Sequence, residues 1–169
     1  MENGLIRDQL PEDDAMVRQL VEDAFRGRPY SDGSEPRIVE ALRAAGALTV
    51  ALVAEEDGEV VGQVAFSPVT IDGRAGDWYG LGPVAVRLDR QGRGIGQALI
   101  RAGLDRIQAL GAQGCVLAGT AGYYGRFGFV ADPRLQSPGI PSEHFLVLPF
   151  GSEVPSGMVE FHSAFEAEP

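Results

Sequence analysis

One short stretch constrains this chain more than any other, the run AVRLDRQGRGIGQALIRAGL from Ala85 to Leu104. Gly92, Gly94 and Gly96 interrupt it, and each glycine costs backbone entropy and leaves no side chain to pack. An apolar run precedes the glycines and a helical pattern follows them, which predicts a strand, a tight turn and a helix. The unpaired N–H groups and the dipole of a first helical turn attract an anion, and glycines let that anion come close.

The charge of this stretch also favours an anionic ligand. Residues 87–106 contain five arginines and two aspartates, in a chain whose net charge is −10. A solvated basic face would give the same balance, so charge alone leaves both interpretations open.

Two common phosphate-binding motifs do not fit this sequence. The dinucleotide fingerprint needs a glycine where Gln97 stands and an acidic residue about 20 positions on, and the P-loop needs a lysine, which the chain lacks.

Hydrophobic periodicity predicts one mixed α/β domain over residues 1–169, with the order β-αα-βββ-α-β-α-β. We expect strands at 4–10, 48–56, 59–72, 79–86, 114–119 and 144–150. We expect helices at 11–25, 35–45, 93–110 and 123–127. Asp57-Gly58 is a strong signal for a hairpin turn between two of these strands. Residues 72–78 are interpreted as a loop, and the tail after residue 154 shows no clear period.

The same periodicity predicts which helix positions face the core. In the first helix these are Met16, Leu20, Val21 and Ala24. In the helix after the glycines they are Ile95, Leu99, Ile100, Leu104, Ile107 and Leu110.

Two motifs on the expected elements resemble those of the GNAT N-acetyltransferase superfamily. QGRGIG, residues 91–96, matches the family's Q/R-x-x-G-x-G/A motif, and it follows a strand as that family requires. YYGRFGF, residues 123–129, matches Y-x-x-x-G-F with Tyr124 in the tyrosine position. The element order is also the family's over nearly the whole chain. The resemblance implies a GNAT-like fold with a splayed central strand. It also implies an enzyme that transfers the acetyl group of acetyl-CoA, its co-substrate, to a primary amine in a ternary complex.

The resemblance further implies a set of cofactor-binding residues. The coenzyme A pyrophosphate would bind the backbone N–H groups of Gly92, Arg93, Gly94, Ile95, Gly96 and Gln97. The pantetheine arm would pair with the splayed strand edge at Val84, Ala85 and Val86. Pro83, which has no N–H, is consistent with disturbed pairing there. Arg87, Arg90 and Arg93 are candidates for phosphate contacts or plain surface residues.

Tyr124 is the expected catalytic residue, because a phenol can donate a proton to the leaving thiolate. A free N–H near Ala85 or Val86 is the candidate donor to the oxyanion. Candidates for the general base are Asp77, Tyr79 and His144. Many members of the family carry an asparagine on the strand before the tyrosine helix, where this chain has Gly119 and Thr120. Thr120 is instead a candidate helix cap.

Composition excludes several other classes of function. A net charge of −10 without any lysine argues against a nucleic-acid binder. No apolar run reaches the roughly 18–20 residues of a membrane span, so no membrane partner is expected. Cys115 lies in an apolar run and is interpreted as a buried residue of a cytoplasmic protein. Two histidines and one cysteine without ligand spacing make a metal site improbable.

The acceptor is not readable from the sequence. A small molecule, a peptide and a protein lysine remain open, as does a non-catalytic acyl-CoA-binding sensor or interaction module. The loops at 26–36 and 133–144 are the expected acceptor loops. They offer Asp32, Glu35 and Glu143 as partners for a cationic amine. The resemblance also implies a possible homodimer.

Overall fold

A twisted mixed sheet organises the protein, and the computed structural model describes residues 4–151 and 153–168. Within these residues the hydrogen-bonded strand order is β1-β2-β3-β4-β5-β8-β6, and β9 joins β3 to the short β7. The strands are β1 (Gly4–Asp8), β2 (Val50–Glu56), β3 (Glu59–Ile71), β4 (Arg74–Val86), β5 (Gly114–Ala118), β6 (Val130–Ala131), β7 (Leu135–Gln136), β8 (Phe145–Pro149) and β9 (Gly157–Glu160). The α-helices are α1 (Asp14–Phe25), α2 (Glu35–Ala44), α3 (Ile95–Ala109) and α4 (Ala121–Tyr124).

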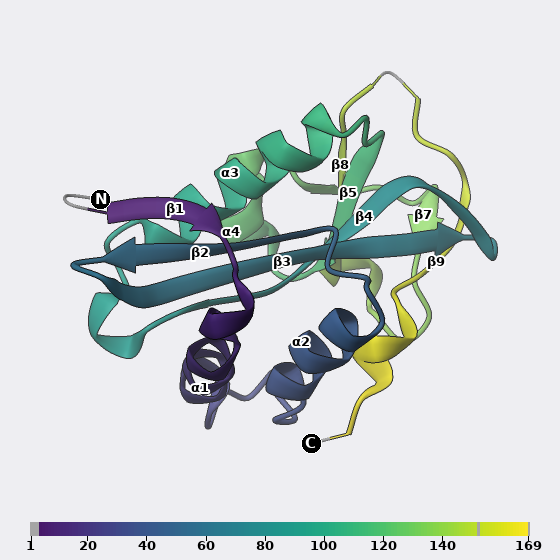
Figure 1. The fold of residues 1–169 in the computed structure, drawn as a ribbon. Helices are drawn as coiled ribbons and strands as arrows, with labels where there is room; N and C mark the ends of the chain where they lie inside the picture. Colours follow the sequence, from purple (N-terminus) through teal and green to yellow (C-terminus); the bar gives the residue numbers. More distant parts are fainter. Residues whose placement is uncertain (1–3, 152, 169) are drawn as a thin grey trace.

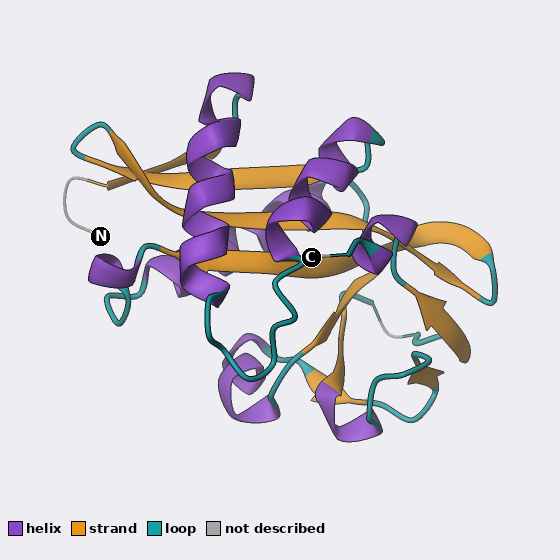
Figure 2. Cartoon of the chain, turned by 90° about the horizontal axis from the view of Figure 1, so that it is seen from below, coloured by secondary structure: helices purple, strands orange, loops and turns teal. Residues whose placement is uncertain are grey.

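Helices cover both faces of the sheet (Figure 1). Helices α1 and α2 lie on one face, where Figure 2 shows them across the central strands. The buried side chains of α1, among them Val17 and Val21, pack there against Val53 and Ala85. Helix α3 lies on the opposite face, and Leu99 and Ile100 pack there on Val64 and Phe66. The β2–β3–β4 strands are therefore sandwiched between two apolar layers.

The expected element order is confirmed, with short additions. The strands β6, β7 and β9 lie in regions whose sequence has no clear period. Strands of two to four residues are too short to show an alternating pattern. Their pairing depends on contacts between distant parts of the chain: Thr70 of β3, for example, pairs with Glu160 of β9.

Tight turns join the long central strands. The predicted hairpin at Asp57-Gly58 is confirmed, since both residues have positive φ, 51° and 81°. A second turn at Asp72-Gly73 has the same geometry, with φ of 51° and 75°. The interpretation of 72–78 as a loop was therefore wrong beyond these two residues. The sequence from Arg74 onward is already strand β4, because the turn returns it antiparallel beside β3.

Two predicted core positions are on the surface instead. Met16 is 52% exposed, because the buried stripe of α1 begins one residue later, at Val17. Leu110 is 63% exposed, because α3 ends at Ala109 and the chain turns away there. Both residues lie at the edge of a helical stripe, where a small error in phase or length reverses the orientation.

Strands β4 and β5 separate within the sheet, as expected of a splayed central strand. They run parallel and pair only at Trp78, Tyr79 and Gly80, which lie opposite 114–116. Beyond Gly80, β4 continues to Val86 along β3, while β5 continues to Ala118 along β8. An irregularity in the β3–β4 register between Val64 and Phe66 marks the same level. The mixed α/β fold with a splayed strand is thus the predicted one.

Among the described residues, no helix is long and apolar enough to cross a membrane.

Candidate functional site

A groove lies where β4 separates from β5. It encloses about 510 Å³, within the usual range of roughly 300–1,000 Å³ for ligand sites. Four parts of the chain line it: the end of α1 with the loop after it, the end of β4, the glycine turn with the start of α3, and α4. The lining residues are Ala24, Phe25, Arg28, Tyr30, Val84, Ala85, Val86, Arg90, Gln91, Gly92, Gly94, Ile95, Gly96, Gln97, Tyr123 and Tyr124.

Two of the three glycines in the turn are required by its backbone. Gly92 and Gly94 have φ of 80° and 82°, a left-handed conformation that side chains disfavour. Gly96 lies inside α3, where an added Cβ would make only ordinary contacts, 3.6 Å from Val86 and 3.7 Å from the hydroxyl of Tyr123. The first N–H groups of α3 have no acceptor within the helix and lie at the groove wall. The turn can therefore present amide donors to an anion.

The open edge of β4 offers further backbone groups. The N–H of Arg87 donates to the Val61 carbonyl at 2.8 Å, so Arg87 faces β3. Antiparallel pairing alternates, and Ala85, opposite Gln63, also uses its backbone groups toward β3. Val84 and Val86 then direct theirs into the groove, where the Gln91 side chain donates to the Val86 carbonyl at 3.0 Å. Of the two candidates for the oxyanion donor, Ala85 and Val86, only Val86 directs its N–H toward the groove.

Tyr124 packs into the groove wall from α4. Its ring lies against the backbone of Gly119, where an added Cβ would be 2.6 Å from the ring. The centroids of the Tyr124 and Tyr123 rings are 4.9 Å apart. Burial raises the pKa of Tyr124 to about 12, with smaller contributions from the nearby phenols of Tyr123 and Tyr30. The phenol is therefore a proton-bearing hydrogen-bond donor throughout the physiological pH range. Thr120 is the N-cap of α4 by position, but its side chain makes no capping bond.

The three candidate phosphate arginines differ in position. Arg87 is held by Asp89 at 2.7 Å and by Glu59 at 2.9 Å, outside the groove lining. Arg90 lines the groove while its other face contacts Asp89. Arg93 is exposed and does not line the groove. Arg93 lies between the left-handed Gly92 and Gly94 with its side chain outside the groove lining, and a contact of its backbone N–H with the pyrophosphate stays a prediction.

The candidate bases are also separated by the fold. Asp77 is exposed near the start of β4, where its carbonyl accepts from the N–H of Gln113, away from the splayed end. Tyr79 is half-buried against the α3-side core. His144 lies beside the end of β5, with its Nδ1 3.3 Å from the Gly119 carbonyl. Of the three, His144 is placed at the splayed end of the sheet.

Cys115 has no access to the groove. It is fully buried in β5, and burial raises the pKa of its thiol. A buried, protonated thiol is a poor nucleophile, so the arrangement does not favour a covalent intermediate on this residue.

Sequence reasoning named the loop at 26–36 as an acceptor loop but missed which of its residues line the groove. Phe25, Arg28 and Tyr30 line the groove, whereas the predicted acceptor-loop acids do not. Asp32 accepts hydrogen bonds from the N–H and hydroxyl of Ser34, and Glu35 accepts one from Ser31. The loop was recognisable from its composition, but the direction of each side chain depends on the docking of α1 onto β4.

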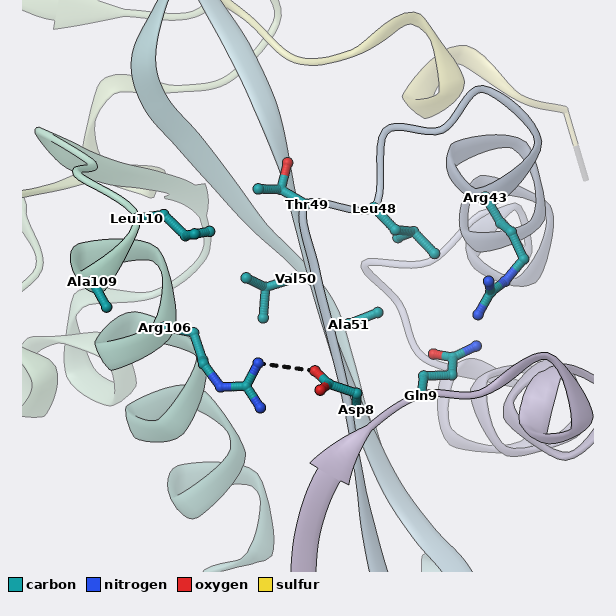
Figure 3. A pocket seen from close by; sticks show the side chains of 10 residues that line it. All are labelled: Asp8, Gln9, Arg43, Leu48, Thr49, Val50, Ala51, Arg106, Ala109 and Leu110. Carbon is teal, nitrogen blue, oxygen red and sulfur yellow. Dashed lines mark hydrogen bonds and ion pairs between the residues drawn. The ribbon is translucent and has the colours of Figure 1, made fainter.

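A second hollow of about 380 Å³ lies at the other end of α3 (Figure 3). Arg106 reaches across it to Asp8 at 2.9 Å, and Leu110 and Leu48 form its apolar rim. The 15 residues of α3 separate this hollow from the glycine turn by about 21 Å along the helix. The carbonyl end of the helix carries partial negative charge, so this hollow does not suit an anion as the groove does.

Comparisons with known proteins show the family to which this fold belongs. The family described as "Acetyltransferase (GNAT) domain" matches residues 6–131. The chain is 36% identical to the "Uncharacterized N-acetyltransferase YhbS" of Escherichia coli K12, over 95% of this chain and 98% of that protein. The chain therefore belongs to the GNAT family of N-acetyltransferases.

Two solved structures show the same fold at high similarity. A GNAT family acetyltransferase from Brucella melitensis, in complex with acetyl-CoA, superposes with a TM-score of 0.87 and 51% identity. That comparison covers 98% of this chain and 99% of the other. E. coli YhbS in complex with CoA superposes with a TM-score of 0.89 and 33% identity, covering 97% of this chain and 92% of the other.

Proposed function

We propose that this chain transfers the acetyl group of acetyl-CoA to a primary amine by direct attack. The observation that carries the proposal is the groove itself, which joins the glycine turn, the free edge of β4 and Tyr124 in one cavity. The relatives of known structure that were solved with acetyl-CoA or CoA support the same ligand. The amide donors of the glycine turn fit a pyrophosphate, and the strand edge fits an amide-bearing arm.

The proposed binding residues are those of the turn and the strand edge. Val84 and Val86 pair with the pantetheine arm as an added strand would, while buried Ala85 fixes the strand to β3. Gly92, Gly94, Ile95, Gly96 and Gln97 place their backbone around the pyrophosphate. Arg93 contributes at most its backbone, since its side chain does not line the groove.

In the reaction, the amine nitrogen forms a bond to the acetyl carbon as the carbon–sulfur bond breaks, and the amine's proton goes to water. The proposed donor to the developing oxyanion is a backbone N–H on the open edge of β4, near Ala85 and Val86, that the pantetheine arm leaves unpaired. Tyr124 donates a hydrogen bond to the departing sulfur. Its pKa of about 12 lies above the roughly 8.5 of a thiol, so complete proton transfer is uphill. Hydrogen-bond donation is therefore its main contribution, and the released thiolate takes its proton from water.

Amine-dependent release of thiol from acetyl-CoA tests the proposed function. Purified protein is incubated with acetyl-CoA and a mixed panel of amines, and free thiol and acetylated products are measured. We expect thiol release to require an added amine. Binding of acetyl-CoA without release for any amine would instead support an acyl-CoA-binding sensor or interaction module.

The same proposal places the enzyme as a single domain in the cytoplasm, where acetyl-CoA is available. Cell fractionation with an antibody against the chain checks the location. Sedimentation of the purified protein checks whether it forms the homodimer that the family resemblance suggests.

A further inference from the structure

The end of the groove nearest α1 has a distinct chemistry. Arg28 and Tyr30 follow α1, and Phe25 meets Tyr30 edge to face with ring centroids 6.1 Å apart. No aspartate or glutamate stands among the described residues that line the groove, although the chain has 24 of them. A cationic group entering the groove would meet arginine and no counter-charge. This lining does not fit the acidic acceptor site that the loop composition suggested.

Arg28 lines the groove with the end of its guanidinium available to an anion. Eight of the fourteen arginines pair with carboxylates among the described residues: Arg7, Arg18, Arg26, Arg43, Arg87, Arg90, Arg106 and Arg134. Arg28 uses only its Nε, which donates to the Ala24 carbonyl at 3.4 Å, and the described residues supply no partner to its two terminal nitrogens. That bond caps the end of α1 and leaves the bidentate edge of the guanidinium available.

Arg28 lies at the reacting end of the groove and not at the phosphate end. Helix α1 packs through Ala24 on Ala85, on the face of the sheet opposite α3 and its amide donors. The phenol of Tyr30, two residues from Arg28, is close enough to Tyr124 to contribute to its raised pKa. The segment after α1 therefore borders the place where sulfur departs and the acceptor enters.

We infer that the acceptor is a small amine that also carries a carboxylate, and that Arg28 binds this carboxylate while Phe25 and Tyr30 enclose the carbon chain. The inference rests on the proposed acetyltransferase function and names its substrate class. A planar guanidinium binds a carboxylate through two parallel hydrogen bonds, which orients the amine as well as holding it. The carboxylate takes no part in the bond changes.

Matched acceptors test this inference. Amino carboxylates of increasing length, from α-amino acids to 4-aminobutyrate, are compared with their carboxamides and with diamines of equal length. We expect kcat/KM to be at least about 10-fold higher for the carboxylates, the size of a charged hydrogen bond. Arg28→Gln should remove most of this preference and leave the Kd for CoA within about twofold. Arg37→Gln, an exposed arginine of α2 outside the groove, is the control and should keep the preference.

The possible failures are distinguishable. If carboxamides or diamines are acetylated as well as carboxylates by the natural protein, the carboxylate inference is wrong while the enzyme assignment stands. A Kd for CoA that rises tenfold or more in Arg28→Gln would assign Arg28 to the cofactor and overturn the inference. If CoA binds and no amine of any class is acetylated, the proposed function fails and the inference fails with it.

Discussion

Tyr124 shows how a fold sets the chemistry of one residue. Its ring fits against Gly119, where a side chain would collide with it, and meets the ring of Tyr123 edge to face in the groove wall. This burial keeps the phenol protonated and directs it into the same cavity as the edge of β4. The neighbouring Tyr123 instead has its hydroxyl near Gly96, at the start of α3. The two adjacent tyrosines thus lie toward different parts of the groove.

Replacing Tyr124 with phenylalanine should lower kcat by about 10²-fold, because one positioned donor to the leaving group is lost. The Kd for CoA should change by less than about twofold, since the ring remains. Steady-state thiol release and a binding titration measure the two quantities. Tyr123→Phe is the matched control. Equal losses in both variants would remove the special role of Tyr124.

The raised pKa of Tyr124 makes a second prediction, for alkaline pH. Below about pH 10 the residue is protonated whether the protein is folded or unfolded. Between about pH 10 and 12 only the unfolded chain loses this proton, so the free energy of unfolding falls as pH rises through this window. Absorbance at 295 nm, measured for the natural protein minus Tyr124→Phe, should show a phenol that titrates near 12. A midpoint near 10 would mean that the residue is solvated.

At the level of elements, strand β4 decides where the site forms. The register of β4 against β3 shifts at Gly82-Pro83, close to the level at which β5 separates from β4. The Gln63 side chain, fully buried on β3, donates from Nε2 to the Pro83 carbonyl at 3.0 Å. A side-chain amide thereby replaces a missing ladder bond and holds the irregular segment that precedes Val84.

Gln63→Leu should therefore destabilise the protein by about 1–3 kcal/mol, because the buried Pro83 carbonyl loses its donor. Urea unfolding measures this change. Gln136→Leu is a close control, since Gln136 donates to the Pro133 carbonyl at 3.4 Å but is exposed. It should change stability by less than about 0.5 kcal/mol. Similar small effects for both variants would show that β4 holds its shape without Gln63.

At the level of the whole molecule, the groove connects two separately packed layers. Helix α1 belongs to the core on one face of the sheet and α3 to the core on the other, and both meet β4. A ligand that contacts α1, β4 and α3 together would stabilise the arrangement of all three. Binding should therefore appear as global stabilisation.

Acetyl-CoA at about 100 times its Kd should add roughly 2.7 kcal/mol to the free energy of unfolding. For a chain of this length that corresponds to a Tm increase of about 5–11 °C. Differential scanning calorimetry with acetyl-CoA, and with ATP as an anion control, measures the effect. An equal increase with ATP would indicate a general phosphate site, and no increase with acetyl-CoA would contradict the cofactor assignment.

Local sequence patterns determined the elements of this protein and the residues of two motifs. The long strands, the helix after the glycines and the Asp57-Gly58 turn were predictable, because each depends on periodicity or turn chemistry within a few residues. The glycine turn was recognisable because a left-handed backbone at Gly92 and Gly94 strongly favours this residue type.

Tertiary structure alone decided which side chains share the groove. Arg28, Phe25 and Tyr30 join a site more than fifty residues away because α1 docks on β4, and no local pattern encodes that docking. Short-range sequence sets backbone conformation, whereas the direction of a loop side chain follows from contacts between elements distant in the chain. The sequence thus determined what kind of protein this is, and packing determined which side chains line its groove.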